Sequence, residues 1–151
     1  MACGYVDGGI RVWSLETWGL ERTLRGHERR ICALVASVGR LISSSEDGTV
    51  REWSVETWGC VQTVEAYPAG SGQWIASLAV CCSALVGGSM GGSAERGVRV
   101  WNLETLRPLH TLRQPAGDDV RSLVGDGREV WGAVGDQVVV WGRRGMAGGG
   151  A

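Results

Sequence analysis

The chain has 151 residues, of which 25 are glycine and eight are tryptophan, and its formal net charge is −1. A hydrophobic fraction of 44% is ordinary for a globular protein, so the chain can bury a core. The near-neutral charge excludes a general nucleic-acid binder and an electrostatic membrane anchor. The longest apolar runs, such as residues 78–82 and 138–141, are far too short to cross a bilayer. We therefore expect neither nucleic acid nor a membrane as a partner.

The cysteines and histidines do not form a metal-binding pattern. The five cysteines are an odd number without a CxxC pair, and the two histidines lie far apart in the sequence. The glycine-rich stretch 87–92 lacks the lysine and the following helix of a phosphate-binding loop. The sequence therefore predicts no metal and no cofactor. Cysteines that serve as small apolar residues, without a visible signal peptide, favour a cytoplasmic location, with the nucleus as the alternative.

Tryptophan marks a repeat along the chain. Four tryptophans follow one another at intervals of 40, 48 and 40 residues, and each ends a segment with alternating apolar positions. Such alternation, rich in Val, Ile and Trp, predicts a strand, while an acidic residue beside a glycine predicts the preceding turn. The segments are DGGIRVW (7–13), DGTVREW (47–53), ERGVRVW (95–101) and GDQVVVW (135–141), and their repeat marks are Asp7, Trp13, Asp47, Trp53, Glu95, Trp101, Asp136 and Trp141.

Two further strands are predicted between successive marks. One begins at Ile31, Ile75 and Val120, and the next begins ten residues later in all three repeats. Two insertions of four residues, around 68–73 and 88–94, fall in turn-rich sequence and account for the longer interval of 48 residues. Helical periodicity is absent from the sequence. We therefore predict an all-β chain of short antiparallel strands.

This pattern resembles the WD-repeat (WD40) β-propeller family, whose marks are a Gly-His pair, an Asp turn and a Trp on a repeat of about 40–45 residues. Gly26-His27, Asp47 and Trp53 match these marks, and the resemblance covers residues 1–141. The family builds blades of four antiparallel strands, which implies three, four, four and three strands here. The implied blades are approximately residues 1–25, 26–65, 66–113 and 114–141, followed by a flexible glycine-rich tail at 142–151.

A partial propeller of about three and a half blades is an open arc unless other chain segments complete it. Closed propellers have at least about four blades. An open arc leaves strand edges exposed, through which copies could self-associate. We expect the chain to be a fragment of a longer propeller or a truncated gene product. The alternative is that two arcs close a ring as a dimer, which would have eight blades, four of them one strand short.

The resemblance also implies a buried hydrogen-bond network in one blade. It consists of His27, Asp47 and Trp53, with Ser43 or Ser45 as the hydroxyl. The other blades lose this network, since Tyr67 and Pro115 take the histidine position, and we expect the blade of His27 to be the most rigid. The same residue types could form a hydrolase triad, but no nucleophile elbow is present and the repeat already accounts for all of them. We therefore predict no enzymatic activity.

Proteins of this family commonly bind partners on the face that carries the loops into the innermost strands and the turns before the acidic mark. Trp74 has no counterpart in the repeat and is therefore the better contact candidate, whereas Trp18 and Trp58 recur and are expected to pack in the fold. By position, the candidate partner-binding face carries Glu28, Arg30, Glu46, Gln73, Trp74, Ala94 and Asp119.

The function implied by this resemblance is that of a non-catalytic scaffold that binds other proteins or peptides. The alternative is the substrate-recognition portion of a larger enzyme, such as a ubiquitin ligase of F-box or RING/TRAF type or a WD-repeat kinase. No RING cysteines or kinase motifs occur within the 151 residues. A catalytic domain would therefore lie outside them.

Overall fold

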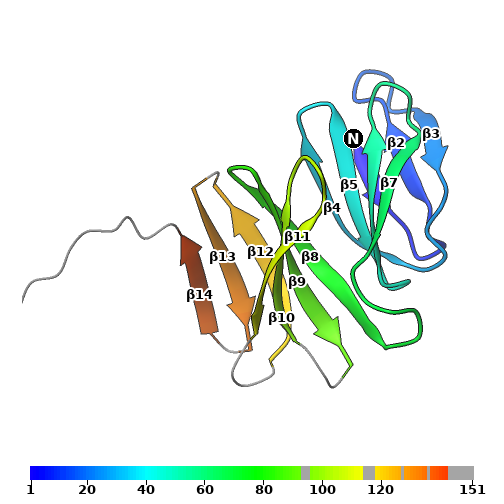
Figure 1. The fold of residues 1–151 in the computed structure, drawn as a ribbon. Coiled ribbons are helices and arrows are strands. Elements are labelled where there is room, and N and C mark those ends of the chain that lie inside the picture. Colours follow the sequence, from blue (N-terminus) through cyan, green and yellow to red (C-terminus); the bar gives the residue numbers. More distant parts are fainter. Residues whose placement is uncertain (93–95, 114–117, 127, 136, 143–151) are drawn as a thin grey trace, which may run out of the picture.

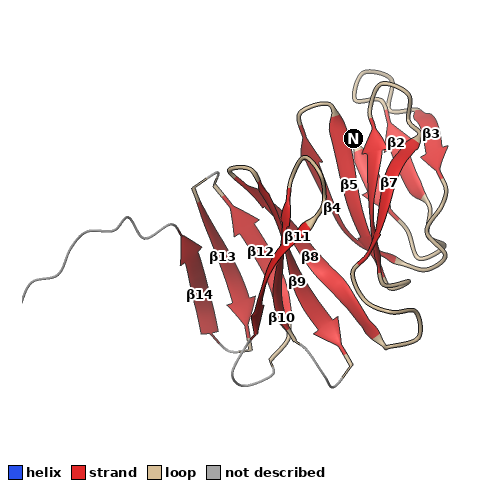
Figure 2. Ribbon diagram, in the orientation of Figure 1, coloured by secondary structure: helices blue, strands red, loops and turns tan. Residues whose placement is uncertain are grey.

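The computed structural model describes residues 1–92, 96–113, 118–126, 128–135 and 137–142. These residues form 14 strands in four antiparallel sheets, and the described part of the chain contains no helix (Figure 2). Consequently it holds no helix of the length and hydropathy needed to span a membrane. The structure confirms the predicted all-β partial propeller.

The four sheets are called blades 1 to 4, and each is a run of strands that are consecutive in the sequence. Blade 1 has β1 (Ala2–Gly4), β2 (Ile10–Trp13) and β3 (Leu20–Leu24), and blade 2 has β4 (Ile31–Ser37), β5 (Arg40–Ser45), β6 (Thr49–Ser54) and β7 (Cys60–Glu65). Blade 3 has β8 (Gln73–Cys81), β9 (Ala84–Gly91), β10 (Gly97–Asn102) and β11 (Pro108–Arg113), and blade 4 has β12 (Val120–Gly125), β13 (Glu129–Val134) and β14 (Gln137–Gly142).

The blades succeed one another in chain order along an open arc. Figure 1 shows blade 1 at one end, in blue, and blade 4 at the other end, in orange. Strands β2, β6, β10 and β14 each contain one of the marked tryptophans. The last strand includes Gly142, one residue beyond the boundary expected at 141, and the remainder of the predicted tail, 143–151, lies outside the described residues.

The acidic marks stand in tight turns before these strands. The Asp47 carboxylate accepts the Thr49 backbone N–H at 2.8 Å, and Asp7 accepts that of Gly9 at 3.0 Å. Gly48, which lies between Asp47 and β6, has a φ of +85°, a value that a residue with a Cβ adopts only with strain. The turn chemistry read from the sequence is thus present at both marks. Glu95 and Asp136 lie outside the described residues.

Each junction between neighbouring blades is an apolar core. Trp53 of blade 2 packs against Ile10 and Leu24 of blade 1. Trp101 of blade 3 packs in the core that blade 3 shares with blade 2. Both indoles are 2% exposed. Val98 and Val120 lie in the third core, between blades 3 and 4. The arc is therefore held together by face-to-face packing of its sheets.

The residue five positions after each of the first three marked tryptophans stands in a left-handed turn, and in blades 2 and 3 it reaches the preceding blade. Trp18, Trp58 and Leu106 have φ values of +56°, +59° and +49°. Leu106 is 2% exposed in the core between blades 2 and 3, and Trp58 packs against the core between blades 1 and 2. Trp18 is 71% exposed, so its predicted packing is wrong. The reason is that no blade precedes blade 1 among the described residues.

Candidate interaction surface

A continuous chain of hydrogen bonds joins His27, Ser43, Asp47 and Trp53 in blade 2. The distance from His27 Nδ1 to Asp47 Oδ2 is 2.8 Å, and that from His27 Nε2 to Ser43 Oγ is 2.7 Å. The Trp53 indole N–H donates to Ser43 Oγ over 2.9 Å. The loop before β4 supplies the histidine, β5 the serine, the β5–β6 turn the aspartate and β6 the tryptophan, so the bonds tie one end of the blade together.

The donors and acceptors of this chain assign its protons. A carboxylate can only accept, so His27 Nδ1–H donates to Asp47, and with the single ring proton on Nδ1 the Nε2 atom accepts the Ser43 hydroxyl proton. The Ser43 oxygen then accepts the Trp53 N–H. Every side-chain polar group of this hydrogen-bond network is satisfied in this arrangement, and a fully satisfied buried network adds rigidity.

The Asp47 carboxylate is the most heavily bonded group of the network. It also accepts the Glu28 backbone N–H at 3.1 Å and the Thr49 hydroxyl at 2.6 Å. Burial favours the neutral acid, but the bonds from His27 and Thr49 outweigh it and hold the pKa of Asp47 well below its usual range. Thr49 was not predicted as a member. A threonine directly after the Asp47-Gly48 pair is the signal that could have identified it.

Of the two serines left open by the sequence, Ser43 belongs to the network. Ser45 has a different role, because its hydroxyl donates to the Arg29 carbonyl at 3.0 Å and accepts the Asp47 backbone N–H at 3.1 Å. It therefore fastens the β5–β6 turn to the loop that enters the blade. Both serine side chains are completely buried.

Blade 3 holds its tryptophan by packing instead. Tyr67 stands at the histidine position, and Gly87 at the position of Ser43 leaves room for the indole. A Cβ on Gly87 would lie 2.9 Å from Trp101 Cζ3. The guanidinium of Arg99 stacks on the Tyr67 ring, 4.1 Å from its centroid.

The geometry of Ser43, His27 and Asp47 is that of a hydrolase triad, but the serine is inaccessible. Its side chain is completely buried, and its oxygen already accepts the Trp53 N–H. A nucleophile must reach the substrate from a cleft. These bonds therefore belong to the fold. No set of three or more His, Cys, Asp or Glu side chains in the described ranges is placed to hold a metal ion.

Four of the predicted face residues line one cavity of about 430 Å³ between blades 2 and 3. The loop before β4, the β5–β6 turn and the loop from β7 into β8 form its walls. The cavity therefore opens beside the hydrogen-bond network, whose Asp47 is part of its lining. The four predicted residues are Glu28, Glu46, Gln73 and Trp74, and they are joined by Arg29, Gly48, Pro68 and Ser71 among others.

Gln73 and Trp74 give this cavity its recognition chemistry. Gln73 is 8% exposed, and its Nε2 has no hydrogen-bond acceptor among the described residues. Trp74 is half-buried, and its ring is held over the backbone, since a Cβ on Gly91 would lie 2.5 Å from Trp74 Cζ3. The site thus combines a nearly buried amide nitrogen that lacks an acceptor among the described residues with a fixed indole.

The remaining predicted face residues are more dispersed. Arg30 is exposed and stands 3.8 Å from the Glu46 carboxylate at the rim of the cavity. Asp119 stands 3.5 Å from Arg96, between blades 3 and 4, and does not line the cavity. Ala94 lies outside the described residues.

Beneath this face, burial together with the Glu46 carboxylate raises the pKa of the Cys32 thiol to about 11.

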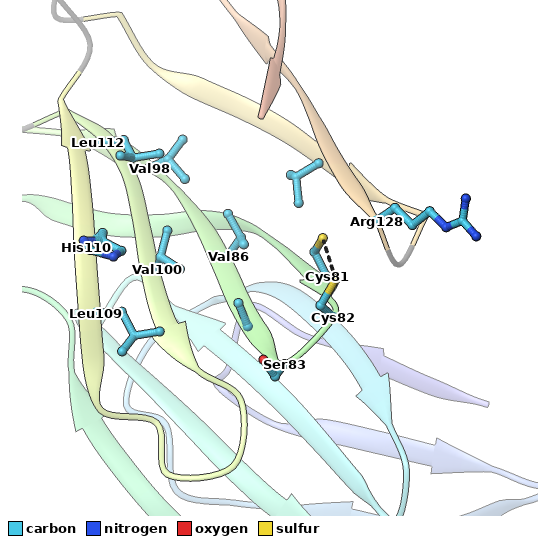
Figure 3. A pocket seen from close by; sticks show the side chains of 12 residues that line it. Cys81, Cys82, Ser83, Val86, Val98, Val100, Leu109, His110, Leu112 and Arg128 are labelled. Carbon is cyan, nitrogen blue, oxygen red and sulfur yellow. Dashed lines mark hydrogen bonds between the residues drawn. The ribbon is translucent and has the colours of Figure 1, made fainter. Parts of the chain in front are cut away.

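A second cavity, of about 460 Å³, lies between blades 3 and 4 (Figure 3). Val86, Val98 and Val100 form its apolar wall, while Cys81 and Cys82 stand at one end with their sulfur atoms 4.0 Å apart. At the preceding junction Trp101 and Leu106 occupy the corresponding positions. Their counterparts here are Trp141 and Met146, whose side chains lie outside the described residues, so no ligand is assigned to this cavity.

Comparison with known proteins agrees with this geometry. Residues 18–54 match the family model of the WD domain, G-beta repeat. This segment of the chain therefore matches one WD40 repeat. The matched segment runs from the turn before β3 to the end of β6 and includes every member of the His27 network.

The fold is also similar to that of solved structures. One is the computationally designed Ika4 protein, a designed propeller that is 26% identical, with a TM-score of 0.75 over 93% of this chain and 83% of that chain. A search of the curated proteins found no match. In all, 951 chains of solved structures match, so the fold alone does not define a partner.

Proposed function

We propose that the chain is a non-catalytic scaffold that binds a polypeptide segment in the cavity between blades 2 and 3. WD40 repeats act in general as protein-interaction modules. The observation that carries the proposal is the Gln73 amide, a nearly buried donor that lines the cavity without an acceptor among the described residues. An unpaired buried donor costs about 1–3 kcal/mol, which a carbonyl of a bound peptide would recover once the Gln73 side chain turns its amide toward the cavity.

The surrounding charges support a peptide over a nucleic acid. The carboxylates of Glu28 and Glu46 lie at the cavity, and Asp47 is held in its ionised form behind them. These three acidic groups outnumber the one basic lining residue, Arg29. A phosphate backbone would be repelled by these groups, whereas a segment with a basic residue would be attracted. Trp74 supplies the apolar contact, and tryptophan is enriched among the residues that dominate binding energy at interfaces.

The test uses a library of random dodecapeptides displayed on phage and selected on the complete chain. Selected peptides should bind Trp74→Ala and Gln73→Ala variants at least about tenfold more weakly, the loss that 1.4 kcal/mol produces. Glu104→Ala is the matched control, because Glu104 is exposed in the β10–β11 turn away from the cavity. Selection without enrichment, or peptides that bind all three variants equally well, would contradict the proposal.

The same cavity would serve the alternative function, in which the arc recognises substrates for an enzyme. Co-purification of a ubiquitin-ligase or kinase subunit with the chain would support that alternative.

We also propose a cytoplasmic location, with the nucleus as the alternative. Cys3, Cys32, Cys60 and Cys81 are free thiols, which is the usual condition in a reducing compartment.

A further inference from the structure

The two ends of the arc expose apolar side chains at positions that are buried at the internal junctions. Blade 4 presents a trailing face, defined by Val124, Trp131, Val138 and Val140. Blade 1 presents a leading face, defined by the exposed Met1 and Trp18 together with the half-buried Trp13. Figure 1 shows the two blades at opposite ends of the molecule.

The trailing face repeats the residues with which each blade packs on the next one. Val138 lies three residues before its marked tryptophan, and it is 77% exposed. The residues at the same position in the other blades are buried and belong to the junction cores, and they are Ile10, Val50 and Val98.

The middle strand of blade 4 shows the same contrast. Trp131 pairs with Val140 just as Ile42 pairs with Glu52 in blade 2 and Val86 with Val100 in blade 3. Ile42 and Val86 are buried against the following blade, whereas Trp131 is 42% exposed. Blade 4 therefore presents a nearly complete junction surface with no blade on it among the described residues.

The leading face repeats the complementary half of the junction. Trp18 stands at the position from which Trp58 and Leu106 cover the preceding blade, and Met1 stands at the position of the buried Leu41 and Leu85. Both are more than half exposed. Exposed apolar patches of this kind mark interaction surfaces.

We propose that a second copy of this chain covers these faces head to tail, so that blade 4 of one copy packs on blade 1 of the next. One chain carries both halves of an interface that it builds three times internally. Such a contact joins two different surfaces, and it closes into a ring when the rotation permits. Two copies bring eight sheets, which is within the range of closed propellers.

Sedimentation velocity of the complete chain over a wide range of concentration tests the proposal. We expect assemblies of two or more copies, which Trp18→Glu and Val138→Glu each dissociate into monomers. Both side chains are exposed in the isolated chain, so these substitutions spare its core. Val38→Glu makes a similar change at an exposed site in the β4–β5 turn, away from both faces, and should assemble like the unchanged chain.

Mixing the two variants distinguishes a head-to-tail contact from every symmetric one. Trp18→Glu keeps an intact trailing face and Val138→Glu keeps an intact leading face, so the mixture should form a one-to-one complex that grows no further. A mixture that stays monomeric would overturn the proposal. So would an unchanged chain that is monomeric throughout, since other segments or proteins would then cover the faces. Assembly that resists both substitutions would also overturn it and would indicate pairing through strand edges.

Discussion

Replacing Ser43 by alanine should destabilise the chain far more than the same replacement one residue later. Ser43→Ala removes the acceptor of the Trp53 N–H, bonded at 2.9 Å, and the donor to His27 Nε2, bonded at 2.7 Å. Each buried polar group left unsatisfied costs about 1–3 kcal/mol, so the pair should cost at least about 2 kcal/mol. That is a large part of the 5–15 kcal/mol by which domains are typically stable.

Ser44 is the matched control, because it is also completely buried but its hydroxyl has no partner among the described residues. Ser44→Ala removes an unsatisfied polar group and should change the free energy of unfolding by less than about 0.5 kcal/mol, or raise it.

The assay is urea unfolding followed by tryptophan fluorescence and circular dichroism. With m-values of about 1–3 kcal/mol/M, the midpoint of Ser43→Ala should fall by about 1 M while that of Ser44→Ala stays in place. In a Trp53→Phe background the indole donor is gone, so Ser43→Ala should then cost about 1 kcal/mol less. Equal costs at the two serines, or a midpoint unmoved by Ser43→Ala, would refute the reasoning.

The remaining predictions concern the same blade. The depressed pKa of Asp47 stabilises the fold fully above the unfolded pKa of about 3.9, so the stability advantage over Asp47→Asn should shrink as the pH of thermal melts falls below that value. Gly48→Ala should cost about 3 kcal/mol or more in urea, because φ is +85° and a Cβ would lie 2.5 Å from the Tyr67 carbonyl oxygen. Gly39→Ala, with a φ of +72° and no atom within 4 Å of the added Cβ, should cost about 1–2 kcal/mol. Amides of β6 should exchange with deuterium more slowly than those of β10 if the network rigidifies blade 2, and equal rates would count against it.

The strand order could be predicted from the sequence because the tryptophan repeat fixes one strand per blade. The alternating apolar positions before Trp53 and Trp101 indicate which side chains face the neighbouring sheet, because successive residues of a strand point to opposite faces. The choice between Ser43 and Ser45 could not be made in this way, because residues two apart share a face. What separates them is position along the strand: Ser43 lies beside the indole, and Ser45 lies at the turn.

The candidate surface was predictable in outline only. The repeat placed Gln73 and Trp74 on the loop-bearing face, but burial of the Gln73 amide depends on the loop from β7, whose length is particular to this blade. The exposure of Trp18 was not predictable from its own repeat. It carries the same signal as Trp58, and only the absence of a neighbouring sheet among the described residues separates the two.

Blades 2 and 3 hold the tryptophan at the same repeat position, Trp53 and Trp101, in two different ways. Each way depends on several residues that must be present together. In blade 2 the serine hydroxyl satisfies both the indole and the imidazole, while Asp47 satisfies the other imidazole nitrogen. In blade 3 the glycine removes the hydroxyl together with its volume, and the aromatic ring at the histidine position stacks with an arginine. Removing only the Ser43 hydroxyl from blade 2 leaves two buried groups, the Trp53 N–H and His27 Nε2, without hydrogen-bond partners. Replacing a whole network by apolar packing, in contrast, can be nearly neutral for stability. The loss of the histidine in blade 3 is therefore matched by the loss of the serine.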